Sequence, residues 1–188
     1  MKKHILVLDL DETLLHTNNN GKTISRPGLQ KFIKELSKHM YLVIYTAALK
    51  SYADELLKKY DIHQYFISKL YRNSCITIDN NYSKDLKIVI KKLLHDKLNN
   101  KNNIPLSLLI NNKQLSLNSI IFIDNLSQNC ILQPNNCIII KDYIGQNNDN
   151  ALQNITKFLL NIRKYSGNNV SQYIPKHIHK ITKFTKNK

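Results

Sequence analysis

The sequence predicts an α/β fold in which a parallel sheet is flanked by helices on both faces. Short, continuous apolar runs alternate along the chain with segments whose apolar residues recur at helical spacing. Continuous runs are typical of strands buried on both faces, and their alternation with helices is typical of parallel sheets. Three runs end in polar side chains: Asp9 with Asp11, Thr46, and Asp124 with Asn125. Because ligand sites in this fold class lie at the carboxyl ends of strands, these residues are the first candidates for a site.

The first half of the chain is expected to form three strands and two helices. The strands are predicted over residues 4–9, 41–45 and 66–72. The first helix should open at Ser25-Arg26-Pro27-Gly28 and run to about 39, with a buried face made of Leu29, Phe32, Ile33 and Leu36. The second should follow Thr46 and run to about 60, with a core side made of Leu49, Tyr52, Ala53, Leu56 and Leu57.

The second half should contain two hairpins, two helices and two strands. The first hairpin is predicted over 75–82, with its turn at Asp79-Asn80-Asn81. A helix is predicted over 84–98, and its inward face should carry Leu86, Ile90, Leu93 and Leu94. Residues 99–103 are expected to form a loop and 106–117 a local hairpin. Strands over 119–123 and 137–140 and a helix over 150–165 complete the predicted fold.

The length of 188 residues is most simply that of one domain. We place a folded domain at residues 1–165 and a basic C-terminal tail without clear periodicity at 166–188. No apolar run approaches the roughly 20 residues that a membrane-spanning helix needs, and no secretory leader precedes the first strand. We therefore expect a soluble intracellular monomer, in the nucleus or cytosol, that does not contact a membrane.

Two features of the composition bear on partners and on redox chemistry. The 28 Lys and Arg residues against 13 Asp and Glu give a formal net charge of +15. This excess favours a polyanionic partner such as nucleic acid, but the codons of an AT-rich genome would enrich Asn, Lys and Ile in the same way. The charge alone does not decide between these explanations. The three cysteines lack metal-binding spacing, so we expect neither a zinc site nor a disulfide framework. We interpret Cys75, Cys130 and Cys137 as buried or incidental thiols.

Asp9 and Asp11 carry the strongest chemical signal in the sequence. Side chains two residues apart on a strand point to the same side, so these carboxylates should be neighbours at the end of the first strand. Two close like charges are costly unless a cation sits between them or one carboxyl holds a proton. Catalysis can use both solutions, with one aspartate as nucleophile and metal ligand and the other as proton donor. The alternative interpretation is an Asp-rich turn that only caps the strand.

Further motifs accompany these aspartates in a fixed order along the chain. They are Asp9-Leu10-Asp11-Glu12-Thr13-Leu14-Leu15-His16, Arg26-Pro27-Gly28, Tyr45-Thr46-Ala47-Ala48-Leu49, Tyr52-Ala53-Asp54, Leu70-Tyr71-Arg72-Asn73-Ser74-Cys75, Tyr82-Ser83-Lys84-Asp85-Leu86 and Ile123-Asp124-Asn125. From about residue 4 to 162 the chain resembles the FCP/SCP-type (NIF domain) phosphatases of the haloacid dehalogenase superfamily, which act on the C-terminal domain of RNA polymerase II. The resemblance implies a Rossmann-like haloacid dehalogenase fold with a small β-hairpin insert and no large cap.

The resemblance also implies a Mg²⁺-dependent protein serine/threonine phosphatase that acts through an aspartyl-phosphate intermediate. Asp9 would attack phosphorus, and Asp11 would protonate the leaving oxygen and then activate water. The metal ligands would be Asp9, the main-chain carbonyl of Asp11, and Asn125, because Mg²⁺ is a hard cation that prefers oxygen.

Roles for the surrounding residues follow from the same resemblance. Thr46 would donate its hydroxyl to a phosphoryl oxygen, and Lys84 would neutralise charge on the transferring group. Asp124 would orient a metal-bound water or Lys84. The substrate groove would be lined by Leu49, Tyr52 and, as a contact to the substrate phosphate, Arg72. The ordinary structural alternatives are a strand end for Thr46, a solvated helix start for Lys84 and a turn for Asp124-Asn125.

The chain departs from the family pattern in two segments. Residues 17–25, between His16 and Arg26, are shorter than the family's stretch there, which helps to build a pocket for proline. We therefore expect little selection for proline beside the phosphoserine. Residues 87–118 are an insertion. Without a large cap the site should be open, which suits a phosphorylated protein segment, with the polymerase repeat as one candidate, better than a metabolite.

Two other functions stay open at this point. A nucleic-acid 3′-phosphatase would suit the basic chain, although Arg72-Asn73-Ser74-Cys75 and Lys84-Asp85-Leu86 resemble the protein phosphatase branch. A catalytically silent phosphopeptide-binding module, like the mitochondrial import relatives of this fold, is disfavoured because the chain retains the whole set of Asp9, Asp11, Lys84 and Asp124-Asn125.

Overall fold

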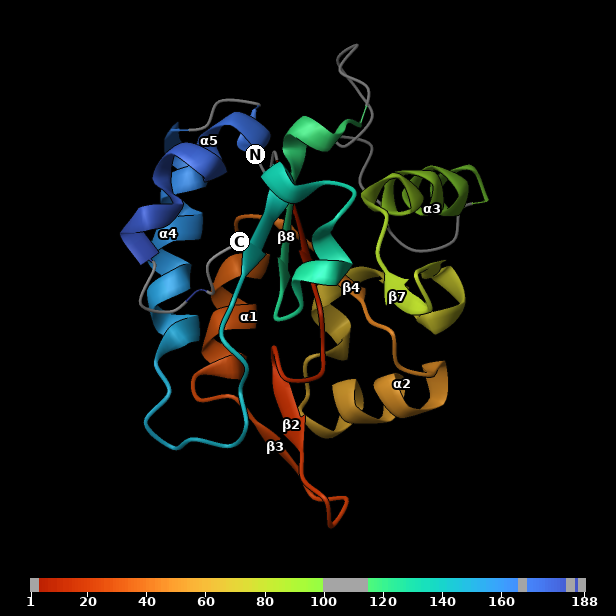
Figure 1. The fold of residues 1–188 in the computed structure, drawn as a ribbon, viewed down its shortest axis with the longest axis vertical. Coiled ribbons are helices and arrows are strands. Elements are labelled where there is room, and N and C mark those ends of the chain that lie inside the picture. The colour runs from red at the N-terminus through yellow and green to blue at the C-terminus, as the bar shows by residue number, and fades with distance from the viewer. Residues whose placement is uncertain (1–3, 100–114, 166–168, 182–184, 186–188) are drawn as a thin grey trace.

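The centre of the molecule is a five-stranded parallel sheet in the order β5-β4-β1-β8-β9 (Figure 1). The computed structural model describes residues 4–99, 115–165, 169–181 and 185. The strands of the sheet are β1 (Ile5–Leu8), β4 (Tyr41–Tyr45), β5 (Phe66–Leu70), β8 (Ile120–Asp124) and β9 (Cys137–Ile139). Each strand overlaps a segment predicted as one, and the parallel pairing confirms the predicted fold class.

Helices cover both faces of this sheet. The α-helices are α1 (Leu29–Ser37), α2 (Lys50–Lys59), α3 (Leu86–Leu98), α4 (Ala151–Tyr165) and α5 (Val170–His177). Short 3₁₀ turns are η1 (His63–Tyr65), η2 (Arg72–Ser74), η4 (Leu117–Ser119), η5 (Ser127–Cys130), η6 (Pro134–Asn136) and η7 (Ile178–Ile181). In Figure 1, α1 and α4 lie on one side of the sheet and α3 lies on the other.

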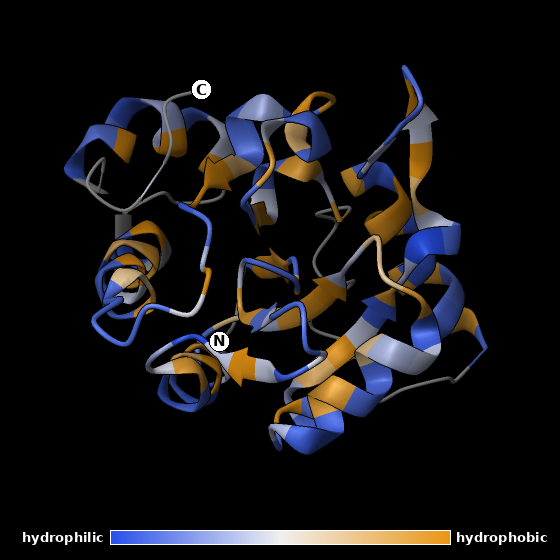
Figure 2. Cartoon of the chain, turned by 60° about the horizontal axis from the view of Figure 1, so that its bottom comes forward, coloured by the Kyte–Doolittle hydropathy of each residue, from blue (hydrophilic) through white to orange (hydrophobic). Residues whose placement is uncertain are grey.

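Alternate residues of the strands supply two separate cores. Leu6 and Leu8 of β1 pack in the core shared with α1, α2, α4 and α5, whereas Ile5 and Val7 pack in the core shared with α3. Successive strand side chains point to opposite faces, so a strand buried on both sides must be apolar throughout. Figure 2 shows this contrast, with largely apolar strands between helices that carry hydrophilic outer surfaces.

Two small hairpins lie outside the main sheet. β2 (Leu15–Thr17) pairs with β3 (Thr23–Ser25), and β6 (Ile76–Ile78) pairs with β7 (Asn81–Ser83). The second hairpin confirms the insert predicted over 75–82. In the part of the chain that the structure describes, no larger cap is inserted.

The buried faces of α1 and α2 match the prediction except at Leu49. α1 buries the predicted four residues, and α2 buries three of the predicted five; the others are Tyr52, which is partly buried, and Leu49, which is 55% exposed. Leu49 has an extended backbone at the position before α2, so its side chain does not follow the helical repeat. Its assignment to the core side of the helix was therefore wrong.

The buried stripe of α3 also differs from the prediction. The fully or nearly fully buried positions are Leu86, Val89, Leu93 and Asp96. They recur at three- and four-residue steps, the spacing of one helix face. Leu94, predicted inward, is 38% exposed because it lies about 100° round the helix from Leu93. Ile90 lies at the edge of the stripe and is partly buried.

Cys130 and Cys137 form a disulfide, with their Cα atoms 6.0 Å apart. This corrects the interpretation of these two residues as incidental thiols. The chain between them turns back through η6, which brings the end of η5 against the start of β9. Sequence spacing does not reveal this pairing because it depends on that turn. Cys75 is a free thiol.

Part of the predicted tail packs on the rest of the molecule. α5 buries Val170 and Ile174 completely, and both belong to the core cluster that α1 and α4 share. Its buried positions follow helical spacing, but the helix is short and contains Pro175, a residue that normally argues against a helix in a sequence. The loop predicted at 99–103 beyond Asn99 and most of the hairpin predicted at 106–117 lie outside the described residues.

Candidate active site

The predicted site residues converge at one edge of the sheet. Asp9 follows β1, Thr46 follows β4 and Asp124 ends β8, and these are three adjacent parallel strands. Their carboxyl ends therefore meet at the same place. A cavity of about 540 Å³ opens there, and its lining includes Asp9, Asp11, Thr46, Leu49, Tyr52, Arg72, Lys84 and Asn125. Asp124 is fully buried behind this lining.

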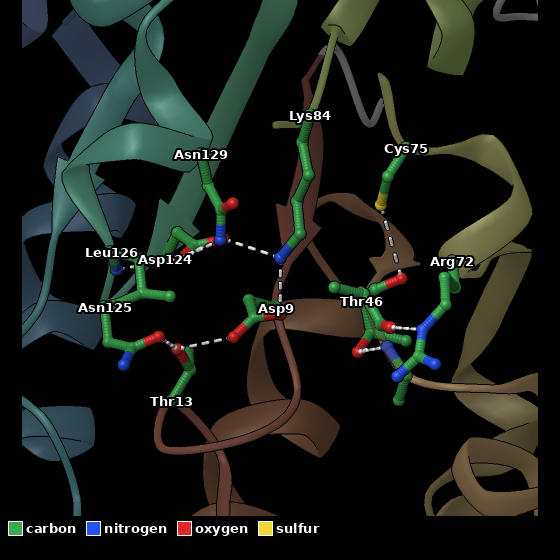
Figure 3. A network of polar contacts seen from close by, with 12 residues as sticks. Asp9, Thr13, Thr46, Arg72, Cys75, Lys84, Asp124, Asn125, Leu126 and Asn129 are labelled. Atoms are coloured by element: carbon green, nitrogen blue, oxygen red, sulfur yellow. Dashed lines mark hydrogen bonds and ion pairs between the residues drawn. The ribbon is translucent and has the colours of Figure 1, made fainter. Parts of the chain in front are cut away.

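Lys84 connects two of the aspartates beneath the cavity (Figure 3). Its Nζ lies 2.5 Å from Asp9 Oδ1 and 2.7 Å from Asp124 Oδ2, and all three side chains are buried. Burial alone would lower the pKa of Lys84, but the two carboxylates outweigh it and raise that pKa. Lys84 therefore stays protonated, at a fixed place beside the candidate nucleophile.

Asp124 is the anchor that holds Lys84 in position. Its carboxylate accepts hydrogen bonds from Asn129 Nδ2 at 3.0 Å to each oxygen and from the Leu126 N–H at 2.8 Å. Charge-assisted bonds of this kind satisfy a buried carboxylate that would otherwise be costly. This ion pair holds the ammonium of Lys84 beside Asp9, while the orienting role that the resemblance implies for Asp124 stays a prediction.

The carboxyls of Asp9 and Asp11 lie in different surroundings. Burial raises the pKa of Asp9 to about 7, although Lys84 pulls it down. Burial also raises the pKa of Asp11, against hydrogen bonds from Tyr52 and Thr46 that lower it. The Tyr52 hydroxyl donates to Asp11 Oδ1 over 2.9 Å, and burial raises the pKa of Tyr52 to about 12, so it is a donor at neutral pH.

Thr13 and Asn125 complete the polar floor of the site. Thr13 Oγ1 lies 3.1 Å from Asp9 Oδ2 and 3.3 Å from Asn125 Oδ1 (Figure 3). Asn125 donates through Nδ2 to Asp142 Oδ1 over 2.8 Å, and its carbonyl oxygen is turned towards the Thr13 hydroxyl, which also contacts Asp9. A carboxylate oxygen of Asp9 and the amide oxygen of Asn125 thus both lie next to the Thr13 hydroxyl.

The oxygen atoms at this place fit a hard divalent cation. Asp9 and Asp124 pair with the ammonium of Lys84, and Asp11 lines the same cavity, so three carboxyl groups lie near one lysine. Among the described residues, no three His, Cys, Asp or Glu side chains gather into a metal-binding group. A cation here would therefore need the Asn125 amide and a main-chain oxygen besides Asp9, which is an oxygen set that suits Mg²⁺.

The rim of the cavity carries the residues predicted to contact substrate. Arg72 is exposed, donates through Nε to the Ala47 carbonyl over 2.7 Å, and lies 5.5 Å from the centre of the Tyr82 ring on β7. These two contacts fix its guanidinium beside Thr46 (Figure 3). Leu49 and Leu126 add exposed apolar surface to the lining, with 55% and 39% of each residue accessible.

Four residues of this arrangement have roles that the sequence interpretation missed. Thr13 and Arg26 belong to motifs quoted for the family, so their positions offered a signal. Arg26 is fully buried and bonds to the Thr13 carbonyl, the Lys141 carbonyl and both oxygens of Asp149, which ties the loop after β1 to the chain after β9. The other two, Asn129 and Asp142, come close only through the fold.

Comparison with known proteins settles the family. The model of the NLI interacting factor-like phosphatases matches residues 4–171. The chain belongs to this family. Among solved structures, "The Structure of Fcp1, an essential RNA polymerase II CTD phosphatase" superposes with a TM-score of 0.63 at 18% identity, over 93% of this chain and 70% of that one. The likeness confirms the haloacid dehalogenase-type fold expected from the sequence.

Relatives in this family carry different names. Phosphatase PSR1 of Saccharomyces cerevisiae is 27% identical over 84% of this chain and 36% of its own length. CTD small phosphatase-like protein 2 of Dictyostelium discoideum is 28% identical over 82% of this chain and 26% of its own. The mitochondrial import inner membrane translocase subunit tim50 of Aspergillus fumigatus is 27% identical over 83% of this chain and 27% of its own length.

The chain thus spans about a quarter to a third of the length of these relatives. Among the described helices of this family member, none is both long and apolar enough to cross a bilayer.

Proposed function

We propose that this chain is a Mg²⁺-dependent phosphatase that removes phosphate from serine or threonine residues of a protein. The observation that carries the proposal is the convergence of Asp9 and Asp11 at the cavity, with the buried Lys84–Asp124 pair behind Asp9. An isolated Asp-rich turn would not need a buried lysine held against its first carboxylate. The family membership adds to this support.

The proposed chemistry has two steps. Asp9 attacks phosphorus, so that a bond forms between its carboxylate oxygen and phosphorus while the bond from phosphorus to the serine oxygen breaks. Asp11 gives its proton to that serine oxygen. In the second step Asp11 takes a proton from water, and the water oxygen attacks the phosphorus of the aspartyl-phosphate. The bond between phosphorus and the Asp9 oxygen breaks, which releases inorganic phosphate and regenerates the Asp9 carboxylate.

The remaining residues stabilise charge during the transfer. Lys84 neutralises negative charge beside Asp9, and the Thr46 hydroxyl donates to a phosphoryl oxygen. The cation would be held by Asp9, Asn125 and the main-chain carbonyl of Asp11. Mg²⁺ at that place supplies positive charge that lets an anionic nucleophile approach an anionic phosphate.

The openness of the site supports the proposed substrate class. No large cap lies over the cavity in the described part of the chain, and its rim offers Arg72 for a phosphate and Leu49 for an apolar side chain. An extended phosphorylated segment of a protein fits such an open rim. The RNA polymerase II C-terminal repeat is the first segment to assay, because relatives are named for it. A monomer in the nucleus or cytosol stays a prediction.

The test is a panel of phosphoserine and phosphothreonine peptides assayed for phosphate release with Mg²⁺, beside a 3′-phosphorylated oligonucleotide. We expect release from peptides that stops with EDTA. Asp9→Asn should keep less than a few per cent of wild-type activity, because the near-isosteric amide cannot form the phospho-intermediate. An unchanged circular dichroism spectrum would show that this variant folds.

A silent phosphopeptide-binding module is the second candidate, favoured by the similarity to the tim50 protein. Peptide binding without phosphate release would support it over the phosphatase. Faster release from the oligonucleotide, with a steep dependence of its binding on salt, would instead support a nucleic-acid phosphatase.

A further inference from the structure

A chain of hydroxyl groups runs from the β2–β3 hairpin to the Asp11 carboxyl. Thr23 and Thr17 are cross-strand partners in that hairpin, and their Oγ1 atoms are 2.8 Å apart. Thr17 Oγ1 lies 2.8 Å from the Tyr52 hydroxyl, which lies 2.9 Å from Asp11 Oδ1. The hairpin thus reaches the candidate acid through α2.

The direction of these hydrogen bonds is fixed by the number of protons. Each hydroxyl has a single proton to donate, and a carboxylate only accepts. When Asp11 is a carboxylate, Tyr52 donates to it, so Thr17 must donate to Tyr52 and Thr23 must donate to Thr17. A tyrosine that receives a hydrogen bond donates a stronger one, because bonds in a chain polarise one another.

The Tyr52 ring is also held by packing. It packs against the main core from the first turn of α2, so its hydroxyl has little freedom to leave Asp11. A second tyrosine of the same segment, Tyr60, donates to the Thr23 carbonyl of the same hairpin and does not reach Asp11. The hairpin is therefore tied to α2 at two points, of which one continues to the site.

We propose that Tyr52 is a positioning residue that holds Asp11 by Oδ1 and so presents Oδ2 to the leaving oxygen of the substrate. Thr17 and Thr23 hold Tyr52 in turn, which gives the shortened hairpin a role in catalysis. The proposal rests on the proposed phosphatase function and deepens it. Tyr52 was predicted to line the substrate groove, and a lining residue would act on binding rather than on proton transfer.

A series of substituted phenyl phosphates separates these two roles. Members of the series have nearly the same shape but leaving groups of different acidity, and kcat/KM reports the steps up to departure of the leaving group. A poor leaving group needs the proton from Asp11, whereas p-nitrophenolate does not. In Tyr52→Phe we expect kcat/KM to fall about tenfold or more for phenyl phosphate and less than about threefold for p-nitrophenyl phosphate, since general acid catalysis contributes about 10²–10⁴-fold.

Matched variants test the rest of the chain of hydroxyls. Thr17→Val removes the hydroxyl at similar shape and should steepen the dependence of kcat/KM on the acidity of the leaving group. Thr17→Ser keeps a hydroxyl and should show the wild-type dependence. Tyr60→Phe loosens the same hairpin without touching Asp11 and should leave the dependence unchanged. Melting temperatures of all variants report whether each one folds.

Two results would overturn the proposal. An equal loss across the whole series in Tyr52→Phe, or no loss at all, would reduce Tyr52 to a lining or structural residue while leaving the phosphatase function intact. A wild-type protein that hydrolyses none of these phosphates and no phosphopeptide would overturn the proposed function itself, and this proposal with it.

Discussion

Lys84 is the residue on which the electrostatics of the site depend. It is fully buried between Asp9 and Asp124, and its removal would leave both carboxylates without their cation. Breaking a buried ion pair costs more than the pair contributes, because the remaining charge stays desolvated. The side chain to which we assign a role in the proposed chemistry thus also stabilises the fold.

We predict that Lys84→Met lowers the free energy of unfolding by about 3–5 kcal/mol, the usual cost of breaking a buried pair. Urea unfolding followed by circular dichroism measures this change. Lys38→Met is the matched control, because Lys38 pairs with Glu35 at the surface and its loss should change stability little. Equal effects of the two substitutions would contradict the buried pair.

Asp142 is the residue that fixes the orientation of the Asn125 amide. Asp142→Ala should weaken Mg²⁺ binding about 10–100-fold, the usual effect of losing a residue that orients a ligand. Titration calorimetry with Mg²⁺ measures this directly, without an activity assay. Asp142→Asn keeps an acceptor oxygen and should bind Mg²⁺ close to wild type. A tenfold loss in the asparagine variant as well would show that the charge, not the hydrogen bond, matters.

At the scale of elements, the β2–β3 hairpin limits what the substrate groove can recognise. Each of its strands has three residues, and its apolar Leu15 is buried in the main core rather than at the cavity. Its other apolar residue, Ile24, is partly buried, and no residue of the two strands is among those that line the cavity. The predicted weakness of proline selection therefore has a structural basis, although substrate preference itself stays a prediction.

We expect kcat/KM for matched phosphopeptides with proline or alanine beside the phosphoserine to differ less than about tenfold. A complete apolar pocket would contribute about 1–3 kcal/mol to the discrimination between them, and an incomplete pocket contributes only part of that. Steady-state kinetics on the two peptides checks this. A larger preference for proline would mean that other segments rebuild the pocket.

At the scale of the whole molecule, α5 belongs to the core that supports the sheet. Ile174 is fully buried there, so Ile174→Ala should lower the free energy of unfolding by about 2–5 kcal/mol, as for other buried isoleucines. Lys176→Ala on the exposed side of α5 serves as the control. An Ile174→Ala variant as stable as this control in urea would mean that residues 169–181 are a separate tail after all.

Most of the fold could be predicted from local patterns in the sequence. The strands of the sheet and the buried face of α1 were predictable because burial on one or both faces leaves a periodic signature in the chain. Asp9, Thr46 and Asp124 could be placed together for the same reason, since each follows or ends a buried parallel strand and such strands share one edge.

The tertiary structure alone decided the contacts that cross between elements. No periodicity encodes the disulfide of Cys130 with Cys137, which depends on the turn through η6, or the bond from Asn125 to Asp142. The hydrogen bond from Tyr52 to Asp11 joins residues 41 positions apart and needs α2 to lie beside the loop after β1. Sequence patterns report burial and local geometry, whereas the partner that each buried polar group finds is set by three-dimensional packing.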